Sequence, residues 1–176
     1  MRKPAGSVSI GKIKGVPIYL HWSFPAGAII PMGYARFSPI PSLYLCMGYV
    51  FLVALHEVGH LAAARITKHH VFSIGISGAG GQCLCEVPRS LKSAALIYSG
   101  GLVAQLALLA IGILGIQLLD DFGSFAYSYF IVTCTAMNAA ILLLNAIPIK
   151  GGPHGGSPTD GYVLWQLLKR YLRNRA

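Results

Sequence analysis

Three long stretches of almost entirely apolar residues limit the folds open to this sequence more than any other feature. Residues 41–66, 93–119 and 125–147 are each longer than the roughly 20 residues that a helix needs to cross a bilayer, and each contains few charged side chains. A fourth stretch, residues 16–35, is similar in length but is interrupted by two prolines. We therefore expect about four transmembrane helices.

The composition also favours a membrane protein. Of the 176 residues, 55% are hydrophobic and only 11% are charged, and the mean hydropathy is +0.61. The net charge of +9 could suggest nucleic acid, but the basic residues form short clusters between apolar stretches and no continuous basic face. We therefore expect the lipid bilayer as a partner, and no nucleic acid.

The distribution of basic residues predicts the orientation in the membrane. They precede the first predicted span, separate the second from the third, and follow the fourth, while the opposite side receives only Arg36, Asp120 and Asp121. The positive-inside rule then places both termini in the cytoplasm. A cleavable signal peptide is the alternative for the N-terminus, but polar residues and Pro25 break the apolar run, and no small-x-small cleavage site follows cleanly.

Two segments outside the predicted spans have patterns of their own. Residues 71–87 place apolar residues on both sides of a Gly-rich SGAGG, which predicts a short β-hairpin that either dips into the membrane or lies on its surface. Residues 161–174 mix aromatic and aliphatic residues with basic ones, which predicts an amphipathic helix on the cytoplasmic membrane surface or packed on the bundle. The expected fold is an all-α membrane protein, a single domain over residues 1–176, with a membrane-associated hairpin.

The second apolar stretch contains HEVGH, which places three ionisable residues inside a predicted span. His56 and His60 lie one helical turn apart on one face and can chelate a single metal ion. Glu57 flanks that face and can act as the base toward a water that the metal activates. Ionisable residues within a span are costly and are functional candidates by default. A hydrogen-bonded cluster of these residues is the alternative, but a cation would compensate for their burial directly.

Two histidines and a water leave tetrahedral zinc one protein ligand short. Among the five carboxylates, Asp120 and Asp121 would lie on the opposite side of the membrane. Glu86, at the end of the hairpin, and Asp160, beyond the fourth span, remain. The CxC pair in the hairpin is weak evidence for a metal site by itself, and we expect all four cysteines to be buried free thiols.

These motifs together resemble the site-2 protease family of intramembrane zinc metalloproteases (peptidase family M50). The resemblance rests on HEVGH, on an Asn-x-x-Pro segment from Asn145 to Pro148, and on the Asp160–Gly161 pair. Residues 15–24, GVPIYLHWSF, are similar to the first span of the branch without a PDZ domain, which includes the sporulation factor protease. Residues 99–109, SGGLVAQLALL, are similar to the family's Gly-Pro-x-x-Asn segment, with Leu102 in place of Pro and Gln105 in place of Asn.

The resemblance implies a zinc endopeptidase that hydrolyses membrane-embedded or membrane-proximal protein substrates in regulated intramembrane proteolysis. It implies His56, His60 and Asp160 as ligands of one zinc ion and Glu57 as the catalytic base. Substrate-binding or site-shaping roles are implied for Asn145, Pro148, Gly101 and Gln105. It further implies a multi-pass protein of a prokaryotic cytoplasmic membrane and leaves room for a regulatory membrane partner or an oligomer.

The sequence departs from the family pattern between Pro148 and Asp160, where IKGGPHGGSPT intervenes. A Gly/Pro-rich loop can fold back, so Asp160 is the expected third ligand and His154, within the insertion, is the reserve candidate. We also expect the hairpin to capture an unwound substrate segment as an added strand. Two other functions stay open: a non-catalytic metal-binding membrane protein or inactive relative, and a soluble metalloprotease, which the span lengths disfavour.

Overall fold

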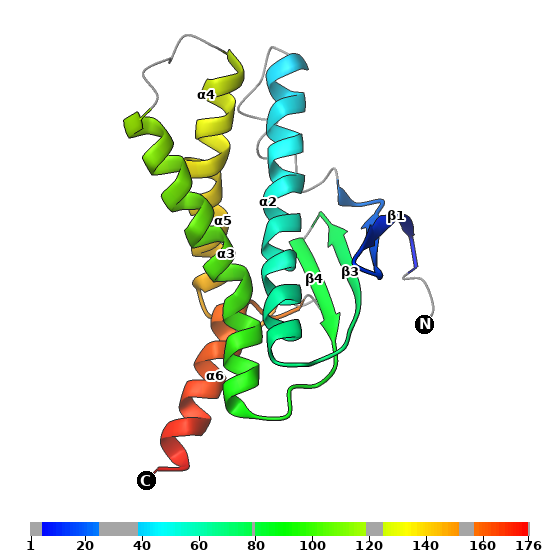
Figure 1. Ribbon diagram of the computed structural model, residues 1–176, viewed down its shortest axis with the longest axis vertical. Coiled ribbons are helices and arrows are strands. Elements are labelled where there is room, and N and C mark those ends of the chain that lie inside the picture. The colour runs from blue at the N-terminus through cyan, green and yellow to red at the C-terminus, as the bar shows by residue number, and fades with distance from the viewer. Residues whose placement is uncertain (1–4, 25–38, 79, 119–124, 152–156, 176) are drawn as a thin grey trace.

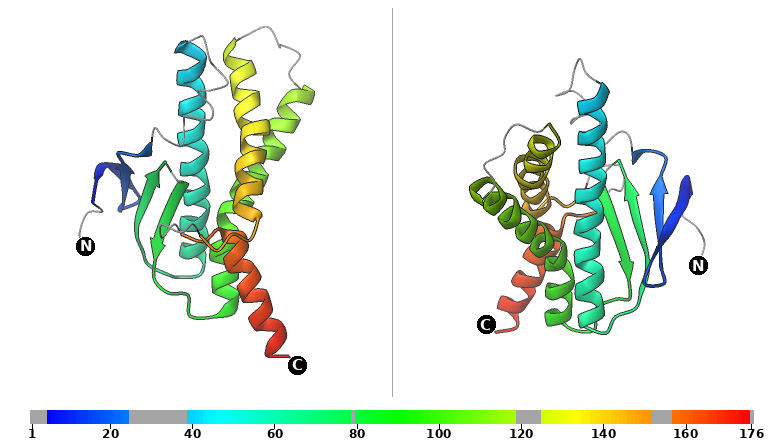
Figure 2. Two further views of the ribbon diagram at one scale, coloured as in Figure 1. Left: turned by 180° about the vertical axis from the view of Figure 1, so that it is seen from behind. Right: turned by 45° about the horizontal axis from the view of Figure 1, so that its top comes forward.

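The structure, a computed structural model, describes residues 5–24, 39–78, 80–118, 125–151 and 157–175. Helix α2 (Pro39–Ile66) has a β-sheet on one side and the other helices on the opposite side (Figures 1 and 2). Those helices are α3 (Leu91–Leu118), α4 (Phe125–Val132), α5 (Asn138–Ala146) and α6 (Asp160–Arg173), with the π-helix η1 (Thr133–Met137) between α4 and α5. The strands are β1 (Ser7–Ile13), β2 (Val16–His21), β3 (Val71–Ser77) and β4 (Gly80–Cys85).

Three helical stretches of the described chain are long and apolar enough to cross a bilayer. They are Leu43–Ile66, Leu91–Gln117 and Ser128–Ala146, the last running through α4, η1 and α5. Large apolar side chains such as Met47 and Leu143 are about 60% exposed on their outer faces. Water would solvate such a surface poorly, whereas lipid matches it. These stretches correspond to the second, third and fourth predicted spans.

The prediction of a first membrane span over residues 16–35 is wrong for its first six residues, which form a strand. Val16–His21 is strand β2, which pairs antiparallel with β1 and parallel with β3. A two-residue turn at Lys14 and Gly15, with φ angles of 47° and 86°, joins β1 to β2 in the geometry that suits a twisted hairpin. Residues 25–35 of the prediction lie outside the described residues. The fold is therefore not all-α, because a mixed sheet accompanies the membrane helices.

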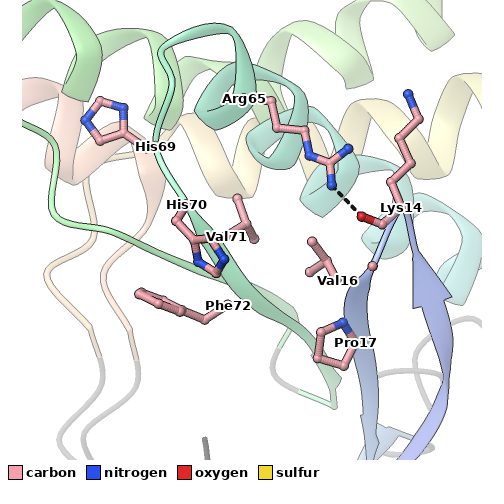
Figure 3. Close-up of a pocket in the computed structure, with 9 residues that line it drawn as sticks. Lys14, Val16, Pro17, Arg65, His69, His70, Val71 and Phe72 are labelled. Atoms are coloured by element: carbon pink, nitrogen blue, oxygen red, sulfur yellow. Dashed lines mark hydrogen bonds between the residues drawn. The ribbon is translucent and has the colours of Figure 1, made fainter.

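The four strands form one sheet in the order β1-β2-β3-β4. The hairpin predicted over residues 71–87 is present as β3 and β4, but it is only half of this sheet. Arg65 of α2 adds a polar link to the sheet, since its Nη2 donates a hydrogen bond of 2.8 Å to the carbonyl oxygen of Lys14 (Figure 3). Apolar side chains fill the space between the sheet, α2 and α3; the buried ones are Val16, Leu61, Ala64, Val71, Ile74 and Ile97.

Helices α2 and α3 come into backbone contact at Gly59 and Gly100. A Cβ atom on Gly100 would lie 2.5 Å from the carbonyl oxygen of Gly59 and 2.9 Å from the Cβ of Ala63. Small residues allow this close approach, and helix association in lipid depends on such packing because the solvent is itself apolar. The contact fixes α3 against the turn of α2 that carries the HEVGH motif.

We expect Gly100→Ala to lower the thermal unfolding midpoint of the detergent-solubilised protein by roughly 3–10 °C, because overpacking costs about 1–3 kcal/mol. The matched control is Gly115→Ala in the same helix, where the added Cβ would lie 3.5 Å from Ile131 Cδ1, an ordinary contact. Light-scattering or fluorescence melting curves measure both. Equal midpoints for the two variants would contradict the proposed role of the Gly59–Gly100 contact.

Candidate metal centre

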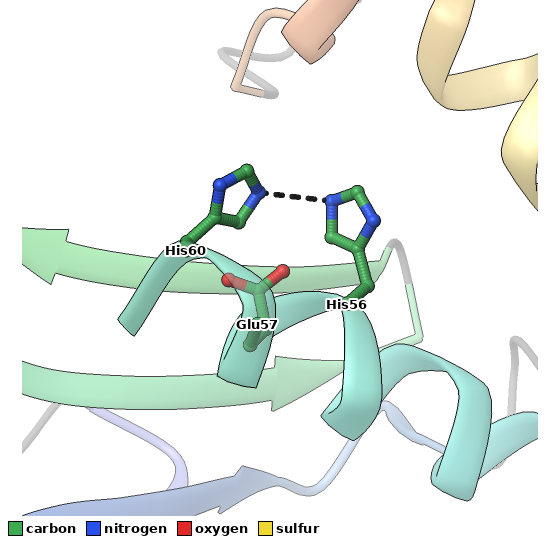
Figure 4. Close-up of side chains that lie close together, drawn as sticks. All are labelled: His56, Glu57 and His60. Carbon is green, nitrogen blue, oxygen red and sulfur yellow. Dashed lines mark hydrogen bonds between the residues drawn. The ribbon is translucent and has the colours of Figure 1, made fainter. Parts of the chain in front are cut away.

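Helix α2 presents the side chains of its HEVGH motif in one buried group (Figure 4). His56, Glu57 and His60 are 6%, 3% and 6% exposed. Their potential ligand atoms all lie within 4.8 Å of one another, so the group can hold a metal ion. The four-residue spacing of the histidines brings their Nε2 atoms to 3.0 Å, with the ring planes 83° apart.

Asp160, the first residue of α6, joins this group from a distant part of the sequence. Its Oδ2 atom lies 3.0 Å from Nε2 of His56 and 3.1 Å from Nε2 of His60. The structure therefore brings together the two histidines and the carboxylate that the sequence analysis expected as ligands. His154, the reserve candidate, lies outside the described residues.

In each histidine, the hydrogen bond made by Nδ1 determines which nitrogen carries the proton and which presents a lone pair to the centre of the group. Nδ1 of His60 is 2.7 Å from the carbonyl oxygen of Ile97, and Nδ1 of His56 is 3.0 Å from Oε1 of Gln105. Both partners are hydrogen-bond acceptors, so each Nδ1 carries the proton and each Nε2 presents a lone pair. A hydrogen bond between the two Nε2 atoms would then require an additional proton on one ring.

Three lone-pair donors consequently converge on one point, at mutual distances of 3.0 to 3.1 Å. They repel one another unless a cation lies between them, and Oδ2 of Asp160 is buried without a hydrogen-bond partner in the described structure. Tetrahedral zinc holds ligand atoms about 3.3 Å apart, so a slight widening of the triangle fits it. Two imidazoles, one carboxylate and an open fourth position form the donor set of a catalytic zinc site.

Glu57 packs against strand β4. Its carboxylate accepts a hydrogen bond from the backbone N–H of Cys83, and a Cβ atom on Gly81 would lie 2.6 Å from its Cδ. Burial raises the pKa of the Cys83 thiol to about 12, and the negative charge of Glu57 adds to this effect. The thiol stays protonated, so this cysteine forms a neutral wall beside Glu57.

The insertion that precedes Asp160 is closed at its base by Thr159. The backbone N–H of Thr159 donates to the carbonyl oxygen of Ile149 at 3.1 Å, and the N–H of Ile149 donates to Thr159 Oγ1 at 3.0 Å. The Thr159 hydroxyl in turn donates to the carbonyl oxygen of Ile147 at 2.6 Å. These bonds, which we call the Thr159 clamp, fix Asp160 relative to the end of α5 independently of the residues within the loop.

Local contacts then orient the helix that begins with Asp160. Oγ1 of Thr159 caps α6 by accepting a hydrogen bond from the backbone N–H of Tyr162 at 3.3 Å. Gly161 packs directly on the carbonyl group of Ala146, where a Cβ atom would overlap the backbone. The Asp-Gly pair thus has a steric reason, since only glycine lets the start of α6 approach α5 this closely.

The other predicted site residues fall into two places. Gly101 lies against the His56 ring, where a Cβ atom would be 2.6 Å from Nε2, and Gln105 is fully buried beside the same ring. Asn145 is half-buried in the last turn of α5, and Pro148 follows that helix and is exposed. The first pair therefore contacts a histidine, while the second pair lies on the segment that leads to the Thr159 clamp.

Asn138 is a buried polar residue that the sequence analysis did not single out. Its Nδ2 donates a hydrogen bond of 2.8 Å to the backbone carbonyl of Gln105. The residue follows η1, and its backbone N–H reaches the carbonyl of Thr133, five residues earlier, as in a π-turn. The sequence contains a signal for this role, because an asparagine within an otherwise apolar span needs a polar partner.

Comparisons with known proteins place this geometry in a known fold. No protein-family model matches the sequence, and no curated protein is significantly similar to it. Among solved structures, the chain is similar to the Site-2 Protease from Methanocaldococcus jannaschii, with a TM-score of 0.70 and 20% identity. The similarity covers 94% of this chain and 72% of that chain. The chain therefore has a site-2 protease-like fold with a buried His-Glu-His group that can hold a metal ion.

We expect the purified protein to hold one zinc ion per chain, and Asp160→Ala to lose most of it because two imidazoles alone bind zinc weakly. His154→Ala, which removes the reserve ligand, is the matched control and should retain full occupancy. Atomic emission on the detergent-solubilised proteins measures the stoichiometry. Loss of zinc from His154→Ala with retention in Asp160→Ala would reverse the assignment.

Gln105→Leu should weaken zinc binding about 10- to 100-fold, because the N–H of His56 then lacks its acceptor and the ring is no longer fixed. Gln117→Leu makes the same change at an exposed position of α3 and should leave the affinity unchanged. Competition with a chromogenic chelator gives both dissociation constants. Equal constants would mean that Gln105 does not position the ligand.

Proposed function

We propose that this protein is an intramembrane zinc metalloprotease that hydrolyses membrane-embedded or membrane-proximal protein substrates, as in regulated intramembrane proteolysis. The observation that carries the proposal is the convergence of three lone-pair donors, at 3.0 to 3.1 Å, beside the buried carboxylate of Glu57. A structural metal site would not need this fourth group. The site-2 protease-like fold supports the same conclusion.

The depth of the site supports a substrate in the membrane. His56 and His60 precede Ile66, where the apolar stretch ends, by ten and six residues, which corresponds to about 15 and 9 Å along the helix. Asp160 is the most exposed ligand, with 12% of its side chain accessible. The Thr159 clamp lies in the segment that follows the last apolar stretch. This segment is rich in basic residues, and the positive-inside rule therefore places it on the cytoplasmic side. We expect water and substrate to reach the site from that side.

The residues of the site have different chemical roles. When bound, zinc would polarise the scissile carbonyl and make the attacking water more acidic. His56, His60 and Asp160 would hold it through the lone pairs described above. Glu57 accepts the proton of the attacking water and passes it to the leaving amine, a role for which its Oε2, buried without a hydrogen-bond partner in the described structure, is available.

Strand β4 provides a place for an unwound substrate. A helical substrate hides its peptide bonds, so a segment of it must become extended before attack. Among the described strands, β4 lies at an edge of the sheet, pairs with β3 on one side, and contacts Glu57 at Gly81. A substrate segment that adds to the outer edge of β4 would lie beside the catalytic base, with main-chain hydrogen bonds as the binding contacts.

A non-catalytic metal-binding membrane protein is the alternative, since it would use the same histidines and carboxylate. It has no need of Glu57, whose burial without a full set of hydrogen bonds is destabilising. The two functions therefore differ in what this one side chain does.

We expect Glu57→Gln to reduce cleavage by on the order of 10²- to 10⁴-fold while one zinc per chain is retained, because the amide cannot accept the proton. Release of fluorescent peptides from labelled casein and from a transmembrane reporter in detergent micelles measures the rate. Glu86→Gln is the matched control: Glu86 pairs with Arg89 on the surface at 3.1 Å and should not affect the rate. Undiminished cleavage by Glu57→Gln would refute the protease mechanism.

A further inference from the structure

A cavity away from the metal centre is lined by lysine, arginine and histidine side chains. The cavity has a volume of about 360 Å³ and lies between the β1–β2 turn, the last turn of α2 and the start of β3 (Figure 3). Its polar wall contains Lys14, Arg65, His69 and His70. Its apolar wall contains Val16, Pro17, Val71 and Phe72.

The electrostatic balance of this cavity favours an anion. None of the described residues that line it is a carboxylate. Glu86, directly after β4, approaches the cavity, and its Oε2 accepts a hydrogen bond of 3.4 Å from the backbone nitrogen of His70. The Glu86 carboxylate is already paired with Arg89, which donates a hydrogen bond to it at 3.1 Å and thereby lowers the pKa of the carboxyl. The positive charges of Lys14 and Arg65 therefore lack a carboxylate within the cavity wall.

Two of the polar side chains have distinct roles. The guanidinium of Arg65 is anchored by its bond to the Lys14 carbonyl, which uses one of its five N–H donors and orients the planar group. His69 is a fixed part of the wall: Nδ1 lies 3.0 Å from Thr67 Oγ1, and Nε2 accepts a hydrogen bond from the backbone N–H of Arg89 at 3.2 Å. Recognition of an anion therefore depends on Arg65, assisted by the exposed side chains of Lys14 and His70.

The position along α2 identifies the kind of anion. Arg65 is in the last turn of a helix whose apolar stretch ends at Ile66, so it lies at the level of the lipid headgroups. Basic pockets at the cytoplasmic ends of membrane helices suit anionic headgroups, and the apolar wall suits the adjoining glycerol and acyl carbons. We propose that the cavity between Lys14, Arg65 and His70 binds the phosphate group of an anionic phospholipid.

A lipid bound here would connect three parts of the fold. It would link the β1–β2 turn to α2 beside the Arg65–Lys14 hydrogen bond, and both of them to the start of β3. Strand β3 pairs along its length with β4, which contacts Glu57. The bound lipid would therefore stabilise the sheet that packs on the metal centre. The proposal holds whether or not the protein is a protease.

Native mass spectrometry of the full, detergent-solubilised chain tests the proposal. We expect phosphatidylglycerol to bind about tenfold more tightly than phosphatidylcholine. Arg65→Gln should remove most of this preference. Lys14→Asn should weaken phosphatidylglycerol binding several-fold without unfolding, because the Arg65 bond uses the backbone carbonyl and asparagine tolerates the φ of 47°.

Lys92→Gln, which removes an exposed charge in the first turn of α3, outside the cavity, is the matched control and should bind phosphatidylglycerol like the unmodified chain. An equal loss in Lys92→Gln and Arg65→Gln would indicate general charge attraction and overturn the proposal. Inorganic phosphate is titrated in parallel, with the thermal midpoint as the readout. An Arg65-dependent stabilisation by phosphate, with no preference between the two lipids, would support the anion site and overturn its assignment to lipid.

Discussion

Burial of ionisable side chains within an apolar helix is the constraint on which this structure depends. His56, Glu57 and His60 lie in the middle of a stretch that otherwise faces lipid or packed side chains, where an uncompensated charge costs several kcal/mol. The fold satisfies this constraint by bringing Asp160 to the histidines, so that one cation can serve three side chains at once. Hydrogen bonds to Gln105 and to the Ile97 carbonyl, together with the Thr159 clamp, hold these atoms in place.

Several polar groups near the site form hydrogen bonds with one another. His56 bonds to Gln105, whose backbone carbonyl accepts a hydrogen bond from Asn138, directly after the π-helix η1. This chain of contacts joins the three stretches that are long and apolar enough to cross a membrane, while Gly59 and Gly100 bring two of them into backbone contact. Because each polar group in lipid must find a protein partner, the network fixes the positions of the helices as well as that of the ligand.

Sequence patterns predicted the parts of this structure that depend on local chemistry. Apolar length identified three spans, and four-residue spacing placed His56 and His60 on one face. Strand β2 was missed because its apolar residues were counted toward a predicted span, and β1 was not predicted at all, although the alternation in SVSIGKI and the following Gly15 are signals of a strand and a turn. The hydrogen bond between Gln105 and His56 could not be predicted, because it depends on how closely α2 and α3 approach.

Because of the Thr159 clamp, the position of Asp160, a candidate metal ligand, does not depend on the length of the loop that precedes it. Ile149 and Thr159 close the loop by paired hydrogen bonds, so the geometry at Asp160 does not depend on what lies between them. Each doubling of such a loop adds only about 0.6 kcal/mol to the entropy of closure. The loop is therefore a natural insertion point, where residues can be added without redesigning the candidate metal centre.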